Sequence, residues 1–414
     1  MLKLMRSALA GAAMTCAFVS GAGAQEPLRA EVMHWWTSGG EAAAVKVFAD
    51  AYTKAGGTWV DSAVAGGQNL RAAAINRIVG GNPPTSSQFN TGRQFDDLVG
   101  QGLLIDLDAV ASENKWSDAI PGPIVEAASR DGKFYAVPVN IHGQNWMFFN
   151  AEAFKNAGIA EAPKTFDEFF AAMDKLKAAG LTPIAWGGQP WQEALVFDAV
   201  LLGQGGKELF FKVYRDKDAE AIQSDDFKRV AETFHRMRDY VDAGAPGRNW
   251  NDATAMVITG KAGVQIMGDW AKGDFIAAGM TPGEQAGCAL VPGNNGYVMG
   301  GDVFVFPKLG DAPTQGQALL AKTMLDPEVQ IAFNKVKGSI PVRTDVDTSS
   351  MDACAQEGAA LVKDEANQVP SVNFLVSADT VGALQDTITS YFNDASATPE
   401  DFAANFADVM SAAD

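Results

Sequence analysis

Hydrophobic and polar positions alternate between two periods over the first hundred residues of the chain. Segments with apolar residues at every second position predict strands, and segments with apolar residues three or four apart predict helices. Because strands that alternate with helices form parallel sheets covered on both faces, the region predicts an α/β layer. The strands and helices are expected, in chain order, at residues 30–36, 41–55, 58–64, 69–79, 86–89 and 94–99.

The pattern changes after this layer. Asp131-Gly132 lies between two short apolar runs and predicts the turn of a β-hairpin. Residues 137–150 form a long run that reads as extended and has polar amides in its middle. We interpret this run as a connection between two domains.

The rest of the chain is mostly helical. Thr165 caps an amphipathic helix that continues to Ala179. Strands over 263–267, 289–292 and 303–307 are expected to return to the first sheet. Because the chain is too long for one core, we expect two hinged lobes. The expected division is a signal peptide at 1–24, an N-terminal α/β lobe at 25–145 plus about 263–335, and a mostly helical α/β lobe at 146–262 plus about 336–414.

The amino terminus has the composition of an export signal. Lys3 and Arg6 precede a short apolar run, and Ala22-Gly23-Ala24 is a small-residue cleavage site. We expect cleavage after Ala24 and a periplasmic protein. Lipid attachment at Cys16 is the less favoured alternative, because that cysteine lies inside the apolar run. No segment is long and apolar enough to predict direct membrane insertion.

Charge and cysteine content exclude several classes of function. A formal net charge of −18 argues against nucleic acid as a partner, because binding to phosphates needs basic patches. Cys288 and Cys354 are expected to form a disulfide in an oxidising compartment, closing a loop of roughly 65 residues; two unpaired buried thiols are the alternative. The two cysteines and three histidines that follow residue 24 give no zinc pattern, so we expect no metal and no cofactor.

Two adjacent tryptophans follow the first strand. Neighbours on a strand face opposite sides, so Trp35 and Trp36 cannot both enter one core from it. At least one is expected at the carboxyl end of the sheet, where open α/β sheets bind ligands. An indole can cover the apolar face of a sugar ring, and Glu41 can accept hydrogen bonds from hydroxyl groups. The alternative is that both tryptophans belong to the core.

Polar and aromatic residues recur at other strand ends. Amides, carboxylates and a lysine can hold hydroxyl groups, and indoles can cover sugar rings, which is typical of a carbohydrate pocket. We interpret His142 as a hydrogen-bonded structural residue rather than a catalytic base. The candidates are Trp35, Trp36, Glu41, Gln88, Asn90, Asn140, His142, Asn145, Gln189, Trp191, Asp269, Trp270, Asp302 and Lys337.

Enzyme motifs are absent from the sequence. No phosphate-binding loop, nucleophile elbow, zinc-protease motif or dinucleotide fingerprint is found. A glycoside-active enzyme stays open as a rival, since Glu41 and Asp302 could form its carboxylate pair. A second rival is a receptor of the same fold for a peptide, polyol or anion. Lys337 as the single cationic candidate among several carboxylates argues against an anion.

Five segments, in order along the chain, resemble one family. The chain is similar to the periplasmic solute-binding proteins of sugar ABC importers, extracellular solute-binding family 1, and among them to the glucose/mannose type. The resemblance covers most of the chain after residue 24. It rests on His34-Trp-Trp-Thr-Ser-Gly-Gly-Glu41, Val137-Pro-Val-Asn-Ile-His142, Gly187-Gly-Gln-Pro-Trp-Gln192, Ala262-Gly-Val-Gln-Ile-Met-Gly-Asp-Trp-Ala-Lys-Gly273 and Val336-Lys-Gly-Ser-Ile-Pro-Val-Arg343.

This resemblance implies a two-lobed periplasmic-binding-protein fold with a hinge and an interdomain ligand cleft. It implies a monomer that binds one small-molecule sugar and delivers it to ABC permease membrane subunits. Glucose-binding relatives carry a late histidine, whereas this chain has Pro370-Ser-Val-Asn-Phe374 there, so Asn373 is a possible substitute donor. The ligand-binding residues carried over are Trp35, Trp36, Glu41, Gln88, Asn140, His142, Trp270, Asp302 and Lys337.

Overall fold

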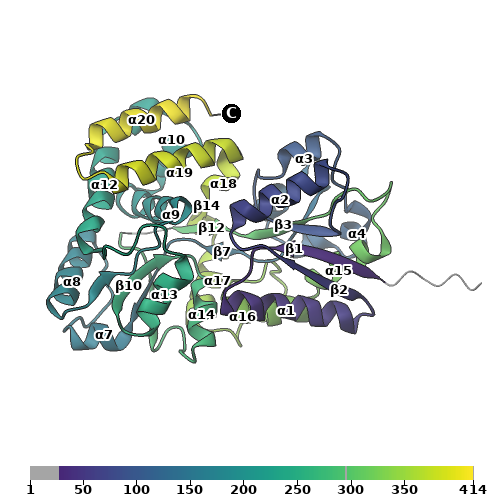
Figure 1. Cartoon of the computed structure of the whole chain (residues 1–414), viewed down its shortest axis with the longest axis horizontal. Coiled ribbons are helices and arrows are strands. Elements are labelled where there is room, and N and C mark those ends of the chain that lie inside the picture. The colour runs from purple at the N-terminus through teal and green to yellow at the C-terminus, as the bar shows by residue number, and fades with distance from the viewer. Residues whose placement is uncertain (1–27, 294–295, 414) are drawn as a thin grey trace, which may run out of the picture.

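The computed structural model describes residues 28–293 and 296–413, which fold into two lobes that lie side by side (Figure 1). The first lobe contains a five-stranded sheet in the order β2-β1-β3-β13-β6. β1 is parallel to β2 and β3, whereas β13 is antiparallel to β3 and β6. The predicted alternation of strand and helix is therefore confirmed. The bounds are β1 Arg29–His34, β2 Thr58–Ala63, β3 Ser86–Asn90, β6 Ala136–Pro138 and β13 Asp302–Val305.

Helices cover both faces of this sheet. α1 (Gly39–Lys54) and α16 (Pro327–Lys337) lie on one face, and α2 (Gly67–Val79) lies on the other (Figure 1). α1 begins with a capping box, in which Ser38 accepts from the backbone N–H of Glu41 and the Glu41 side chain accepts from the backbone of Ser38. The start of α1, and with it Glu41, is therefore held at the carboxyl end of β1.

The second lobe contains a four-stranded sheet in the order β11-β8-β10-β9. The expectation that the strands near 263–267 and 289–292 return to the first sheet is wrong, because β10 pairs with β8 and β9 and β11 pairs with β8. Only β13 joins the first sheet. β10 is buried throughout, and an apolar strand of this kind fits the centre of either sheet equally well. The bounds are β8 Trp146–Asn150, β9 Thr182–Ile184, β10 Ala262–Met267 and β11 Ala286–Leu290.

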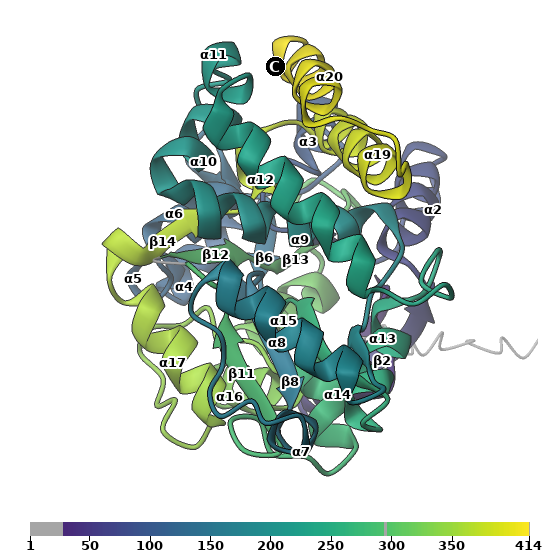
Figure 2. The same ribbon diagram turned by 90° about the vertical axis from the view of Figure 1, so that its left-hand side faces the viewer.

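A group of helices forms one end of the second lobe (Figure 2). Their shared core is aromatic: Phe197 lies 5.4 Å from Phe402 and 5.7 Å from Phe406 between ring centroids. Such ring pairs stabilise a core beyond the area that they bury. The helices are α9 Pro190–Val200, α10 Gly206–Tyr214, α12 Asp225–Arg236, α19 Ala378–Asn393 and α20 Pro399–Ser411.

The chain between 136 and 150 crosses from one lobe to the other. β6 belongs to the first sheet, β8 to the second, and β7 (His142–Gly143) between them to a third sheet of order β14-β12-β7. The expected single extended run is therefore three short strands in three sheets. β12 (Tyr297–Gly300) leads directly into β13 of the first sheet, and β14 is Gln368–Pro370. The third sheet thus lies where the two lobes meet (Figure 1).

Two further predictions are confirmed. β4 (Ser129–Arg130) and β5 (Lys133–Phe134) form the expected antiparallel hairpin. Cys288 and Cys354 form a disulfide, which joins β11 to α17 (Ala353–Val362). The predicted signal peptide lies outside the described residues. Among the residues that are described, no helix combines the length and apolar character needed to cross a membrane.

The remaining helices are shorter or peripheral. They are α3 Asp96–Gly100, α4 Asp108–Glu113, α5 Trp116–Ala119, α6 Gly122–Ala128, α7 Ala151–Asn156, α8 Phe166–Ala178, α11 Ala219–Ile222, α13 Trp250–Ile258, α14 Ala271–Ala277, α15 Gln315–Met324 and α18 Val372–Leu375, with a π-helical turn at Leu201–Gly205 and 3-10 turns at Met237–Tyr240 and Glu365–Asn367.

Candidate functional site

A cavity of about 410 Å³ lies between the two lobes. The first lobe contributes the turn between β1 and α1, the start of α2 and the end of β3, and the second lobe contributes α9, the start of α13 and α19. The volume and the mixed polar and aromatic lining are typical of a small-ligand site. Six of the nine predicted site residues line the cavity, namely Trp35, Glu41, His142, Trp270, Asp302 and Lys337.

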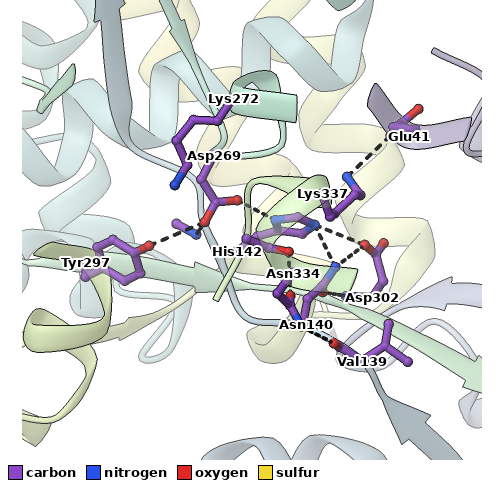
Figure 3. A network of polar contacts seen from close by, with 12 residues as sticks. Glu41, Val139, Asn140, His142, Asp269, Lys272, Tyr297, Asp302, Asn334 and Lys337 are labelled. Atoms are coloured by element: carbon purple, nitrogen blue, oxygen red, sulfur yellow. Dashed lines mark hydrogen bonds and ion pairs between the residues drawn. The ribbon is translucent and has the colours of Figure 1, made fainter. Parts of the chain in front are cut away.

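Asp302 begins β13 and lies at the cavity wall with only 4 % of its surface exposed. One carboxylate oxygen accepts from the side-chain amide of Asn140 at 2.8 Å and lies 3.0 Å from Nε2 of His142 (Figure 3). The other accepts from the side-chain amide of Gln88 at 3.0 Å. Burial alone would raise the pKa of Asp302, but His142, Lys337 and Asn140 together lower it. Asp302 is therefore a fixed, ionised hydrogen-bond acceptor.

His142 lies between two carboxylates. Its Nδ1 is 2.5 Å from Oδ1 of Asp269, and its Nε2 faces Asp302 (Figure 3). Burial by itself would lower the pKa of His142, but the attraction of Asp269 and the hydrogen bonds to both carboxylates outweigh it, so the pKa is raised. A protonated imidazole held in this way donates from both nitrogens. The geometry agrees with the structural interpretation of His142.

Lys337 and Glu41 form a buried ion pair on the first-lobe side of the cavity. The ammonium group of Lys337 lies 3.4 Å from Oε1 of Glu41, and both residues line the cavity (Figure 3). Burial raises the pKa of Glu41, and the charge of Lys337 offsets only part of that effect. The ammonium also lies 5.8 Å from the ring centroid of Trp270, within cation–π range.

The two adjacent tryptophans have different environments. Trp35 is partly exposed and lines the cavity. Trp36 is 1 % exposed and packs against the rings of Phe304 at 5.5 Å and Phe333 at 5.3 Å. The expectation that both indoles face the ligand is therefore corrected for Trp36, because neighbouring side chains of an extended backbone point to opposite sides.

Gln88 and Asn140 lie behind the cavity wall rather than in it. Both are fully buried and neither lines the cavity. Gln88 accepts from the backbone N–H of Trp35 at 3.0 Å and donates to Asp302, and the side-chain oxygen of Asn140 accepts from the backbone N–H of Asp302 at 2.7 Å. Each residue therefore positions a group that faces the cavity.

Several residues that line the cavity were not predicted from the sequence. Their segments contain no motif, and only the packing of the lobes brings them to the cavity. Asn90, Gln189 and Trp191 were candidates from their places at strand ends and do line it, as does Asn373. The lining residues that were missed include Gln68, Arg71, Gln94, Gln144, Asp198, Tyr214, Trp250, Asn251 and Gln385.

Two α/β lobes joined by crossing strands, with polar groups and indoles between them, define a receptor for a small solute. The sequence model of the family described as "Bacterial extracellular solute-binding protein" matches residues 36–331. The chain belongs to this family, whose members bind solutes and are not enzymes. The glycoside-active rival is thereby excluded.

Named relatives and solved structures agree with this membership. A "Probable sugar-binding periplasmic protein" of Brucella suis is 43 % identical over 404 residues, covering 94 % of this chain and 95 % of the relative. A solved chitin oligosaccharide binding protein has a TM-score of 0.78 at 20 % identity, covering 93 % and 98 % of the two chains. The bacterial solute receptor AcbH, described as preferring β-D-galactopyranose exclusively, has a TM-score of 0.78 at 18 % identity, covering 92 % and 97 %. These two structures show the fold, which is the predicted two-lobed one.

Proposed function

We propose that this protein is the periplasmic substrate-binding component of a sugar ABC importer. It binds a monosaccharide with a glucose- or mannose-like ring in the cavity between its lobes and delivers it to the membrane permease. The name of the Brucella relative supports a sugar as the ligand and the periplasm as the compartment. The observation that carries the proposal is the partly exposed indole of Trp35 in one cavity with Glu41, Asp302 and Lys337. An indole face, carboxylate acceptors and an ammonium donor suit a polyhydroxylated ring.

The proposed mechanism is a ligand-driven shift between open and closed arrangements of the lobes. We assign residues 28 to about 140 and about 301 to 340 to one moving body, because β13 and α16 pack with the first sheet. The remaining residues form the other body, which includes β10 and β11. Closure around the sugar would bring Trp191 and Trp270 of the second lobe toward Trp35 of the first.

Calorimetric titration with a panel of monosaccharides tests this proposal. We expect one hexose to bind with micromolar or tighter affinity, to raise the melting temperature and to change tryptophan fluorescence. Asp302→Asn keeps the shape of the side chain and removes its charge, and we expect it to weaken binding by about 2 kcal/mol. Stabilisation by a polyol such as sorbitol with no response to any sugar would favour the receptor for another solute instead.

A further inference from the structure

Arg71 extends from α2 into the cavity at the same place as Trp35. Its guanidinium carbon lies 6.0 Å from the centroid of the Trp35 indole, and both residues line the cavity. Within residues 28–293 and 296–413, no carboxylate lies within ion-pair distance of Arg71 and no hydrogen bond is made by its guanidinium group. Burial lowers the pKa of Arg71 to about 10, which leaves it protonated at neutral pH. It is therefore a cation without a counter-charge.

The other charged groups that line the cavity already have partners. Lys337 pairs with Glu41, and His142 pairs with Asp302. The carboxylate of Asp198 accepts from the hydroxyl of Tyr214 at 2.5 Å, and burial raises the pKa of Asp198 to about 7, so this group is only partly charged at neutral pH. Arg71 is thus the unmatched charge of the cavity. Because Arg71 adds a second cation beside Lys337, the charge of the cavity does not disfavour an anionic ligand.

We propose that the ligand is a hexuronic acid, a hexopyranose ring with a carboxylate, and that Arg71 binds that carboxylate. The inference rests on the proposed function, because it assumes a sugar ring on Trp35. A ring stacked on this indole would have its substituents next to the guanidinium group. Guanidinium binds carboxylate through two parallel hydrogen bonds, which are stronger than bonds between neutral groups. The hydroxyl groups of the ring would face Asp302, Glu41 and Lys337.

Isothermal titration calorimetry with matched pairs of sugars tests the proposal. The probes are D-glucuronate with D-glucose, D-galacturonate with D-galactose and D-mannuronate with D-mannose. We expect at least one uronate to bind at least tenfold more tightly than its neutral partner, and this preference to shrink with added salt. Arg71→Gln is expected to abolish the preference, so that this variant binds the uronate no more tightly than the neutral hexose. Arg71→Lys, which keeps the charge, is expected to retain part of the preference.

Arg77→Gln is the matched control on the same helix. Arg77 pairs with Glu31 through contacts of 2.6 and 2.9 Å and does not line the cavity, so the preference should persist in this variant. A neutral hexose that binds wild type as tightly as its uronate overturns the uronate assignment and leaves the sugar receptor intact. Equal loss of affinity for the uronate and for its neutral partner in Arg71→Gln also overturns the uronate assignment. That result is expected if Arg71 pairs with Asp198 when the lobes close. Failure of all six sugars to bind overturns the proposed function as well.

Discussion

Nδ1 of His142 lies 2.5 Å from Oδ1 of Asp269, which links the strand that crosses between the lobes to the end of β10 in the second sheet. Nε2 of the same imidazole faces Asp302 of the first sheet at 3.0 Å. One side chain therefore connects carboxylates that belong to both lobes. This bridge lies at the wall of the cavity, so the charge of His142 bears on stability and on the position of Asp302.

The raised pKa of His142 predicts a pH dependence of stability. Because the folded state holds the proton more tightly than the unfolded state, the stabilisation is complete below the unfolded pKa of about 6.5 and is lost as the pH rises through the folded pKa. His142→Gln should remove this dependence and lower the free energy of unfolding by about 3 kcal/mol near pH 6. Urea unfolding of both proteins from pH 5.5 to 9 measures the difference, and a constant difference over that range would contradict the prediction.

Trp35 and Trp36 should respond differently to truncation. Trp35→Ala removes a partly exposed indole from the cavity, so sugar affinity should fall at least tenfold, with less than about 1 kcal/mol lost in stability. Trp36→Ala leaves a void among Phe48, Phe304 and Phe333 and should lower the free energy of unfolding by about 3–5 kcal/mol. Calorimetric titration and urea unfolding of both variants measure the two effects. A larger loss of affinity in Trp36→Ala than in Trp35→Ala would reverse the assignment of the two indoles.

Local patterns were enough to predict much of the fold. The alternation of strand and helix after residue 28, the hairpin at Asp131-Gly132 and the Cys288–Cys354 bridge all follow from periodicity, turn chemistry or compartment. The placement of β10 in the second sheet could not be predicted from such local patterns. Its burial pattern is the same in either sheet, and only contacts with β8 and β9, far away in sequence, decide between them.

The site was predictable where residues stand at strand ends and unpredictable where helices supply them. Trp35 follows β1, at the carboxyl end where ligand sites of α/β sheets are expected. Asp302 is the first residue of β13, and because β13 is antiparallel to β3, this residue lies at the same edge of the sheet. Arg71 and Asp198 lie within α2 and α9, whose cavity-facing sides are determined by how the lobes pack. Sequence periodicity shows that a helix has a polar side, but it does not show what that side faces.

The Cys288–Cys354 bridge should affect stability more than binding. It closes a loop with a sequence separation of 66 and joins β11 to α17, and neither cysteine lines the cavity. Replacing both cysteines with serine should lower the free energy of unfolding by about 4 kcal/mol through the greater entropy of the unfolded chain. Urea unfolding and sugar titration of the double variant, beside wild type in reducing agent, measure both properties. A tenfold loss of affinity in the folded double variant would show that the bridge also shapes the site.

Gly268 lies directly against the indole of Trp270. A Cβ atom at Gly268 would lie 2.1 Å from the Trp270 indole, far inside van der Waals contact. Gly268→Ala should therefore displace the indole from the cavity, where it packs edge-on to His142 with ring centroids 4.9 Å apart. We expect sugar affinity to fall at least tenfold in a protein that still folds. Gly100→Ala is the control, because a Cβ atom there meets nothing within 4 Å. Calorimetric titration measures the affinity of both variants, and near-ultraviolet circular dichroism reports the environment of the indole. Unchanged spectra and unchanged affinity in Gly268→Ala would show that the position of Trp270 does not depend on this glycine.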